Sequence, residues 1–189
     1  MSNPTNTTLI FDLDGTLADS LHTWVKIYNQ LAHEFNSKLI KKDDYDRLRN
    51  TPTKQIFEEF GVTKLQLPKL VLRIKKELSQ QIEHIKPITS MPQTLGKLNQ
   101  AGFHLGIMTS NTQQNVKLFL KKHNLSDLFE FIYTGRNLFG KDKVIRRLLK
   151  EQKIDKASAI YVGDEVRDIE AAHKVGMAVV GVSWGMNSR

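Results

Sequence analysis

Short runs of apolar residues alternate along the chain with longer segments in which apolar residues recur at helical spacing. The apolar runs have the length of buried strands and cover residues 8–13, 103–109, 129–134, 158–164 and 178–184. The helical patterns between the later runs cover residues 92–100, 112–123, 142–152 and 165–175. Gly102 and Gly176 follow two of these patterns, at the position where helices commonly end in glycine. The alternation predicts an α/β fold, in which helices cover both faces of a parallel sheet.

One interval interrupts the alternation between strands and helices. From residue 17 to residue 85 the sequence contains no convincing strand, and helical patterns cover residues 21–35, 43–49, 52–60 and 69–85. This interval is too long to be a single crossover helix between two parallel strands. We therefore predict a helical subdomain of residues 17–86, inserted into an α/β core of residues 1–16 and 87–189.

Composition limits the classes of protein that the chain can represent. Its 189 residues are enough for one domain with an insert, and 40% hydrophobic with 25% charged residues is ordinary for a globular protein. There are no cysteines, which excludes disulfides, thiol catalysis and cysteine-ligated zinc. The N-terminal segment is polar and does not resemble a signal peptide, and no apolar run is long enough to span a membrane. We expect a cytoplasmic protein that does not bind membranes.

The formal net charge of +8 raises the possibility of nucleic-acid binding. The basic residues are spread along the chain, however, and do not alternate with aromatic residues as in RNA-binding segments. We interpret the most basic helical stretch, residues 73–86, as a solvated helix face. Nucleic acid is therefore an unlikely partner, and a basic surface around a site for an anionic substrate explains the charge equally well.

The segment FDLDGTLADS, residues 11–20, carries the first candidate chemistry. Asp12 and Asp14 follow an apolar run two positions apart, so in an extended chain their carboxylates lie on one side. Two like charges at this separation disfavour joint ionisation unless a cation such as Mg²⁺ lies between them. The simpler interpretation is an Asp-Gly turn. A calcium loop is excluded, because its first and twelfth positions would be Ile10 and Leu21.

Two further predicted strands also end in polar residues. The second ends in Thr109, Ser110 and Asn111, and the fourth is followed by Asp164. Ligands of open parallel sheets bind beyond the carboxyl ends of the strands, so these groups are expected to converge with Asp12.

Each of these strand ends also has a simpler interpretation. Ser110 with Gln113 fits a capping box, although a helix N-terminus with a hydroxyl can also hold a phosphate. Asp164 and Asp168 lie four residues apart, where Asp164 could be a helix N-cap or could complete a carboxylate metal site. A site with several carboxylates and a phosphate also needs a cation, for which Lys141 and Lys143 compete.

In this order, the motifs DLDGT, GIMTSN, Lys141 and VGDEVRD resemble the four motifs of the haloacid dehalogenase-like hydrolase superfamily, in particular its phosphoglycolate-phosphatase-like branch. The resemblance covers residues 9–184. It implies a Rossmann-like parallel sheet of strand order 5-4-1-2-3, and it identifies the helical insert as a small cap. Two departures are that Asp142 stands where many relatives have proline, and that similar proteins usually continue beyond the fifth strand with a further strand and helix.

The resemblance also implies roles for individual residues. Asp12 would be the nucleophile that forms an aspartyl-phosphate, and Asp14 the general acid and base, whose backbone carbonyl binds Mg²⁺. Thr109 and Lys141 would hold the phosphoryl group. Asp164 would ligate Mg²⁺, with Asp168 supporting the metal or the lysine.

Other residues are expected to contact the substrate. In the core these are Thr16, Ser110 and Asn111. From the cap, the segment LRNTPTKQ would contribute Arg49 or Lys54, although Thr51 and Pro52 in it also read as the first residues of a helix.

Together these residues predict a Mg²⁺-dependent phosphatase that acts on a small phosphorylated metabolite, as a monomer or homodimer. Asp14 favours phosphoryl transfer, because dehalogenases of the superfamily lack this aspartate. A phosphomutase with the same motifs, or a non-catalytic binding or regulatory protein on this fold, remains the alternative.

Overall fold

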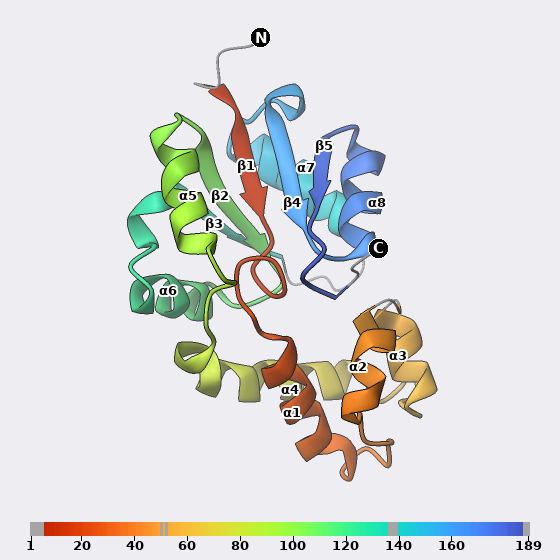
Figure 1. Ribbon diagram of the computed structural model, residues 1–189. Helices are drawn as coiled ribbons and strands as arrows, with labels where there is room; N and C mark the ends of the chain where they lie inside the picture. The colour runs from red at the N-terminus through yellow and green to blue at the C-terminus, as the bar shows by residue number, and fades with distance from the viewer. Residues whose placement is uncertain (1–5, 50, 52, 136–139, 187–189) are drawn as a thin grey trace.

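The structure is a computed structural model that describes residues 6–49, 51, 53–135 and 140–186, without the side chains of residues 53 and 54 (Figure 1). Its centre is a five-stranded, fully parallel sheet of order β3-β2-β1-β4-β5. The strands are β1 (Thr8–Phe11), β2 (His104–Thr109), β3 (Phe131–Thr134), β4 (Ala159–Gly163) and β5 (Ala178–Gly181). The predicted strand order is confirmed.

Helices cover both faces of the sheet. Successive side chains of a strand point to opposite faces, so the apolar side chains of a strand need a cover on each side. Leu9 and Phe11 of β1 pack into the core on the side of α5 (Met91–Gln100) and α6 (Gln113–Lys122). Ile10 packs into a second core with α7 (Lys141–Glu151) and α8 (Val166–Val175). Both faces of β1 are therefore buried. Residues that contact a ligand are expected to follow this strand at its carboxyl end.

Between β1 and α5 the described chain forms helices and no strand, and Figure 1 shows these helices below the carboxyl ends of the strands. They are α1 (Leu21–Ala32), η2 (Lys42–Asp44), α2 (Tyr45–Arg49), α3 (Thr53–Glu59), α4 (Leu67–Gln81) and η3 (Ile82–His84). Aromatic rings pack this part together: the ring of Tyr28 is stacked on that of Trp24 at 5.7 Å between centroids and meets the edge of Phe60 at 6.3 Å.

The chain crosses between the two parts at two segments that lie side by side. Ala18 forms an antiparallel bridge with Pro87, the N–H of Asp19 donates to the carbonyl of Lys86 at 2.9 Å, and that of Ile88 donates to Leu17 at 2.9 Å. We propose that this pairing is the boundary between a core of residues 1–16 and 87–189 and a helical subdomain of residues 17–86.

The predicted first strand is too long at its C-terminal end. It was expected to reach Leu13 but ends at Phe11, because residues 13–18 form a tight turn. The carbonyl of Leu13 accepts the N–H groups of Thr16 at 3.3 Å and of Leu17 and Ala18 at 2.9 Å. The turn directs the chain from the sheet towards α1.

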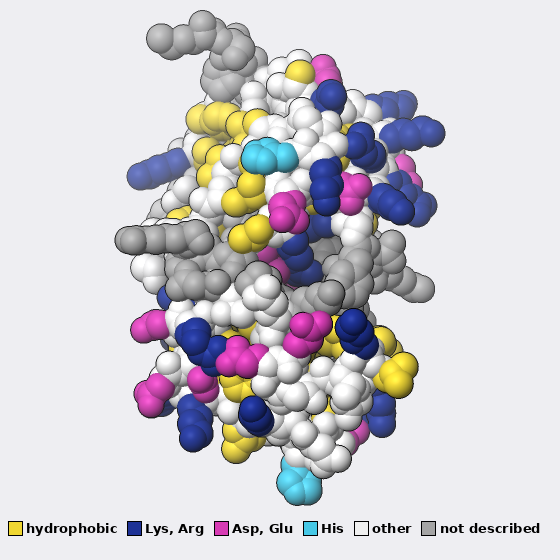
Figure 2. All heavy atoms as spheres, turned by 90° about the vertical axis from the view of Figure 1, so that its right-hand side faces the viewer, with side chains coloured by type: hydrophobic (Ala, Val, Ile, Leu, Met, Phe, Trp, Pro, Cys, Tyr) yellow, Lys and Arg dark blue, Asp and Glu magenta, His cyan; other side chains and the backbone are white. Residues whose placement is uncertain are grey.

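Charged side chains of both signs are visible on both parts of the face shown in Figure 2, with Lys and Arg more frequent over the upper, sheet-bearing part. No helix within the described ranges is long and apolar enough to cross a membrane.

Candidate functional site

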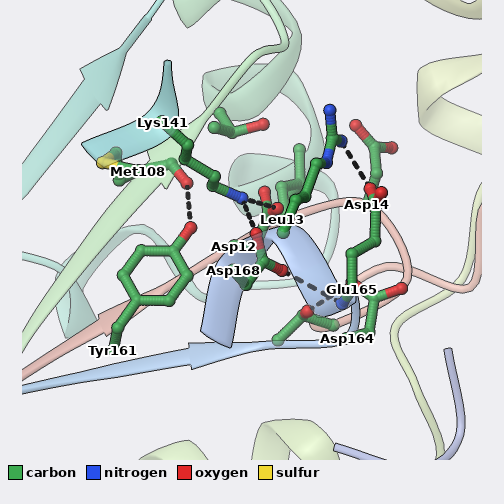
Figure 3. Close-up of polar contacts among 12 residues, drawn as sticks. Asp12, Leu13, Asp14, Met108, Lys141, Tyr161, Asp164, Glu165 and Asp168 are labelled. Atoms are coloured by element: carbon green, nitrogen blue, oxygen red, sulfur yellow. Dashed lines mark hydrogen bonds and ion pairs between the residues drawn. The ribbon is translucent and has the colours of Figure 1, made fainter. Parts of the chain in front are cut away.

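Three loops meet at the carboxyl ends of β1, β2 and β4, in the centre of the sheet (Figure 3). They bring together Asp12, Thr109 and Asp164, all of which are buried although they are polar. These positions are 97 and 55 residues apart in sequence. The convergence that the strand ends predicted is thus present in the structure.

Asp12, Asp164 and Asp168 form a buried acidic cluster, with one carboxylate oxygen of each within 4.8 Å of the others. The carboxylate of Asp14 does not belong to this cluster. The expectation that Asp12 and Asp14 lie on one side assumed an extended chain, whereas the chain turns after Leu13. The carboxylates that share a site with Asp12 instead come from the loop and helix that follow β4.

Lys141 lies at the start of α7 and neutralises part of this cluster. Its Nζ donates to Oδ2 of Asp12 at 2.6 Å and also to Oδ1 of Asp168 (Figure 3). Burial alone would lower the pKa of Lys141, but the charges of Asp12 and Asp168 hold this pKa well above its usual value. Lys143, the competing candidate, is exposed to solvent. The geometry therefore favours Lys141 over Lys143.

Asp164 is held by two donors from different segments. Its Oδ1 accepts from the hydroxyl of Thr16 at 2.9 Å and its Oδ2 from the N–H of Met186 at 2.8 Å. Burial, with the charge of Asp12 as the second cause, raises the pKa of Asp164 to about 7. The N-cap of α8 is Glu165, so the interpretation of Asp164 as a helix cap is wrong.

Asp168 lies in the first turn of α8 and is fully buried. Besides binding Lys141, it accepts the N–H of Glu165 at 3.1 Å through Oδ2. One carboxylate thus contacts both the start of α8 and the lysine.

Asp14 faces away from the cluster, towards the loop after β2. Its Oδ2 accepts from the side-chain amide of Asn111 at 3.1 Å, and its buried Oδ1 makes no hydrogen bond within the described part of the chain. Burial, with the charge of Asp12 as a second cause, raises the pKa of Asp14 to about 6. A carboxyl group in such surroundings is suited to exchanging a proton near neutral pH.

The loop after β2 differs from its predicted form. The N-cap of α6 is Thr112, which accepts the N–H of Asn115 at 3.2 Å, so the capping box of Ser110 and Gln113 is wrong. Because the helix begins later, Ser110 and Asn111 remain in the loop that follows Thr109, the last residue of β2. The hydroxyl of Thr109 there accepts the N–H of Asn111 at 3.1 Å.

Gly15 allows the turn after Asp14 to approach the site. Its φ of +77° is in the left-handed region, and a Cβ added there would lie 2.2 Å from Oδ2 of Asp164. We expect Gly15→Ala to displace Asp164 and to cost about 1–2 kcal/mol of backbone strain in addition. Urea unfolding and metal titration measure the two effects. Gly61→Ala is a suitable control, since it also has a positive φ of +86° but nothing within 4 Å of the added Cβ.

Two cavities open on these residues. The smaller, of about 20 Å³, is lined by Asp12, Thr109, Ser110 and Lys141 among others. The larger, of about 140 Å³, lies between the strand ends and the helical insert and includes Asp14, Ser110 and Asn111 in its lining. Figure 2 shows acidic and basic side chains between the upper and lower parts of the molecule.

The described residues that the insert contributes to the larger cavity are not the ones named from the sequence. Arg49 lies on α2 and lines neither cavity, because the insert contributes to the larger cavity through α1, α3 and α4. The side chain of Lys54 is outside the described residues. The cation that α4 places there is Lys75, whose Nζ donates to the carbonyl of Ser110 at 2.8 Å. The interpretation of residues 73–86 as a solvated face is therefore wrong at Lys75.

Lys75 and Arg167 are cavity residues that the sequence analysis did not identify. Of the two, only Lys75 can be recognised from a pattern in the sequence. Val71, Lys75 and Leu78 are spaced four and three residues apart, which places this lysine within an apolar helix face. Arg167 lines both cavities and forms an ion pair with Glu165. The direction in which the Arg167 side chain points depends on the bend of the chain between β4 and α8. No periodic pattern in the sequence predicts that bend.

Three comparisons with known proteins agree with this geometry. The chain is 35% identical over 181 residues to a phosphoglycolate phosphatase of Synechococcus elongatus, covering 96% of this chain and 85% of that protein. It is 24% identical to the pyrophosphatase PpaX of Bacillus velezensis, over 97% of this chain and 86% of the relative. A crystal structure described as a predicted phosphatase from Clostridium acetobutylicum superposes with a TM-score of 0.81 at 25% identity, over 97% and 87% of the two chains.

The comparison with protein families covers nearly the whole chain. Residues 9–182, from the first residues of β1 to the residue after β5, match the family described as haloacid dehalogenase-like hydrolase. This range contains all three residues of the acidic cluster, together with Asp14, Thr109 and Lys141. The chain belongs to the haloacid dehalogenase-like hydrolase family.

Proposed function

We propose that this hydrolase is a Mg²⁺-dependent phosphatase that cleaves a small phosphomonoester through an aspartyl-phosphate on Asp12. The observation that carries the proposal is the position of Asp12. Its carboxylate is buried beside Lys141, within the acidic cluster, and lines a small cavity that it shares with Thr109. A nucleophile, a cation and a hydroxyl donor around one cavity are the groups that phosphoryl transfer requires.

The residues fit a hard divalent cation. One oxygen of each of three carboxylates lies within 4.8 Å of the others, and Lys141 pairs with two of these carboxylates. Burial and the charge of Asp12 raise the pKa of Asp164, and a cation bound at this carboxylate would favour its ionised form. We propose that Asp12, Asp164 and the backbone carbonyl of Asp14 hold Mg²⁺, while Asp168 holds Lys141. Mg²⁺, when bound, supplies charge neutralisation for the phosphoryl oxygens.

In the first step a carboxylate oxygen of Asp12 attacks phosphorus, and the bond between phosphorus and the ester oxygen breaks. Asp14, in its acid form, donates its proton to the departing ester oxygen. Lys141 and Thr109 hold the phosphoryl oxygens, and Ser110, Asn111 and Thr16 keep the surrounding loops in place. Orientation and charge stabilisation of this kind account for most of the catalysis in phosphoryl transfer.

In the second step Asp14, now ionised, takes a proton from a water molecule. The water oxygen attacks phosphorus, the bond to Asp12 breaks, and inorganic phosphate and the free Asp12 carboxylate result. The hydrogen bond from Asn111 to Oδ2 leaves the buried Oδ1 of Asp14 as the oxygen that carries the proton in both steps.

We propose a small phosphorylated metabolite as the substrate, since the named relatives are a phosphoglycolate phosphatase and a pyrophosphatase. The proposed protein is a monomer or homodimer that does not bind nucleic acid.

The first test is phosphate release from 4-nitrophenyl phosphate by the purified protein. We expect turnover with Mg²⁺, a loss of about 10²-fold or more in chelator, and recovery when Mg²⁺ is added back. Release of inorganic phosphate distinguishes a phosphatase from a mutase, which would return the phosphoryl group to an organic acceptor. Equal rates with Mg²⁺ and with chelator would contradict the proposed metal dependence.

A further inference from the structure

We propose that the larger cavity binds the leaving group of the substrate, and that this group is an alcohol with an apolar body about the size of a phenyl ring. The inference rests on the proposed phosphatase function and adds a substrate class to it. It differs from what the names of the relatives suggest, because glycolate is a small and charged leaving group.

The position of the cavity makes it the place for a leaving group. Ser110 and Arg167 line both cavities, so the larger cavity adjoins the smaller one in which Asp12 lies. Asp14, the proposed proton donor to the leaving oxygen, lines the larger cavity. An ester whose phosphorus lies beside Asp12 would therefore direct its alcohol past Asp14 towards the helical insert.

Apart from Ser20 and Lys75, the residues that the insert contributes to the lining of the cavity are apolar. Leu21, Trp24, Phe57, Val71, Ile74 and Leu78 line the cavity. The ring of Trp24 meets the ring of Phe57 at 5.8 Å between centroids, with 61° between their planes, which gives the cavity an aromatic wall. Such rings pack favourably against another ring or an aliphatic body.

The size of the cavity agrees with this class of group. Its volume is about 140 Å³. An apolar cavity of about 150 Å³ lined by leucine, isoleucine and phenylalanine binds benzene. A glycolate moiety would leave much of this space unfilled and would expose the apolar walls to water.

Both cations that line the cavity already have polar partners. Arg167 forms an ion pair with Glu165, and the ammonium of Lys75 donates to the carbonyl of Ser110 and is attracted by the charge of Asp14. Burial lowers the pKa of Lys75, which means that its surroundings disfavour the charged form of this side chain. A carboxylate on the leaving group would therefore enter a site that also holds the carboxylate of Glu165.

The test compares three esters of primary alcohols: benzyl phosphate, ethyl phosphate and 2-phosphoglycolate. We expect kcat/KM for benzyl phosphate to exceed that for each of the others by about tenfold or more, since one methylene group already discriminates by this factor in an apolar pocket. Val71→Phe fills the cavity and should lower the benzyl-to-ethyl ratio about tenfold. Leu72→Phe, one residue along α4 on an exposed position, is the matched control and should keep the ratio.

The outcomes separate the two proposals. Hydrolysis of ethyl phosphate without a preference for benzyl phosphate would overturn the inference and leave the phosphatase function standing. A preference for 2-phosphoglycolate that disappears in Lys75→Met would also overturn it, because it would make Lys75 an anion-binding residue. No hydrolysis of any ester, with Mg²⁺ bound, would overturn the proposed function together with the inference.

Discussion

Asp12→Asn is expected to lower kcat by about 10⁴-fold or more, because an amide cannot attack phosphorus as a carboxylate does. The substitution keeps the size of the side chain, and the amide oxygen of the new side chain could still accept the N–H of Leu13, which donates to Oδ1 of Asp12 at 2.7 Å. Removing one of three clustered carboxylates should also weaken Mg²⁺ binding. Steady-state kinetics at saturating Mg²⁺ separates the loss of the nucleophile from the loss of metal affinity.

Asp127→Asn is the matched control for this variant. Asp127 is an exposed residue of the short helix η4 (Ser126–Leu128), it lines neither cavity, and its substitution removes the same charge. We expect it to keep the wild-type kcat. A variant at Asp12 that retains a tenth of the activity would show that another group forms the bond to phosphorus.

The second large effect is expected for Lys141→Met, in both activity and stability. The lysine side chain is only 14% exposed and binds Asp12 and Asp168, so its removal leaves two buried carboxylates without their cation. Breaking such a buried pair costs about 3–5 kcal/mol. Urea unfolding in chelator should show this loss, and added Mg²⁺ should restore part of it. We also expect kcat/KM to fall by about 10²–10³-fold.

Lys143→Met provides the comparison for this variant, two residues further along α7. Lys143 is exposed, so the free energy of unfolding and kcat/KM should stay within the range of an ordinary surface substitution. Similar losses in both variants would mean that the reduced charge of α7, and not the contact with Asp12, causes the effect.

The fold was predictable because strands and helices of an α/β core carry strong local signals. Each strand appeared as an apolar run, and the order β3-β2-β1-β4-β5 followed from the resemblance to the family. The ends of the elements were less predictable. The run through Leu13 looks like strand, but three N–H groups that bond to the Leu13 carbonyl turn the chain there. This turn depends on the positive φ of Gly15, and no periodic pattern of apolar residues marks it in the sequence.

The core of the site was also predictable, because its residues follow directly from strand ends. Asp12, Thr109 and Asp164 converge as the sheet topology requires, and Lys141 forms an ion pair with Asp12. The sequence could not reveal that Asp168 and not Asp14 shares the cluster with Asp12. That choice depends on how the turn at Gly15 and the start of α8 place their side chains.

The insert was the least predictable part of the site. The segment LRNTPTKQ suggests Arg49 or Lys54 as a substrate contact, but the described residues of the insert that line the larger cavity lie on α1, α3 and α4 or just before α1. The many charges of residues 73–86 indicate a solvated helix face, whereas Lys75 lies on the face that Val71 and Leu78 share. Which face of a helix meets a distant strand end is a property of tertiary packing, and this packing is not local in the sequence.

Detection of the covalent intermediate tests the central claim most directly. The protein is mixed with Mg²⁺ and substrate, quenched, and reduced with borohydride, which converts an aspartyl-phosphate to homoserine. Peptide mass spectrometry then locates the modified residue. The proposed mechanism predicts homoserine at position 12, dependent on substrate. Active protein in which the modification lies on another residue, or in which rapid quenching during turnover captures none, would contradict it.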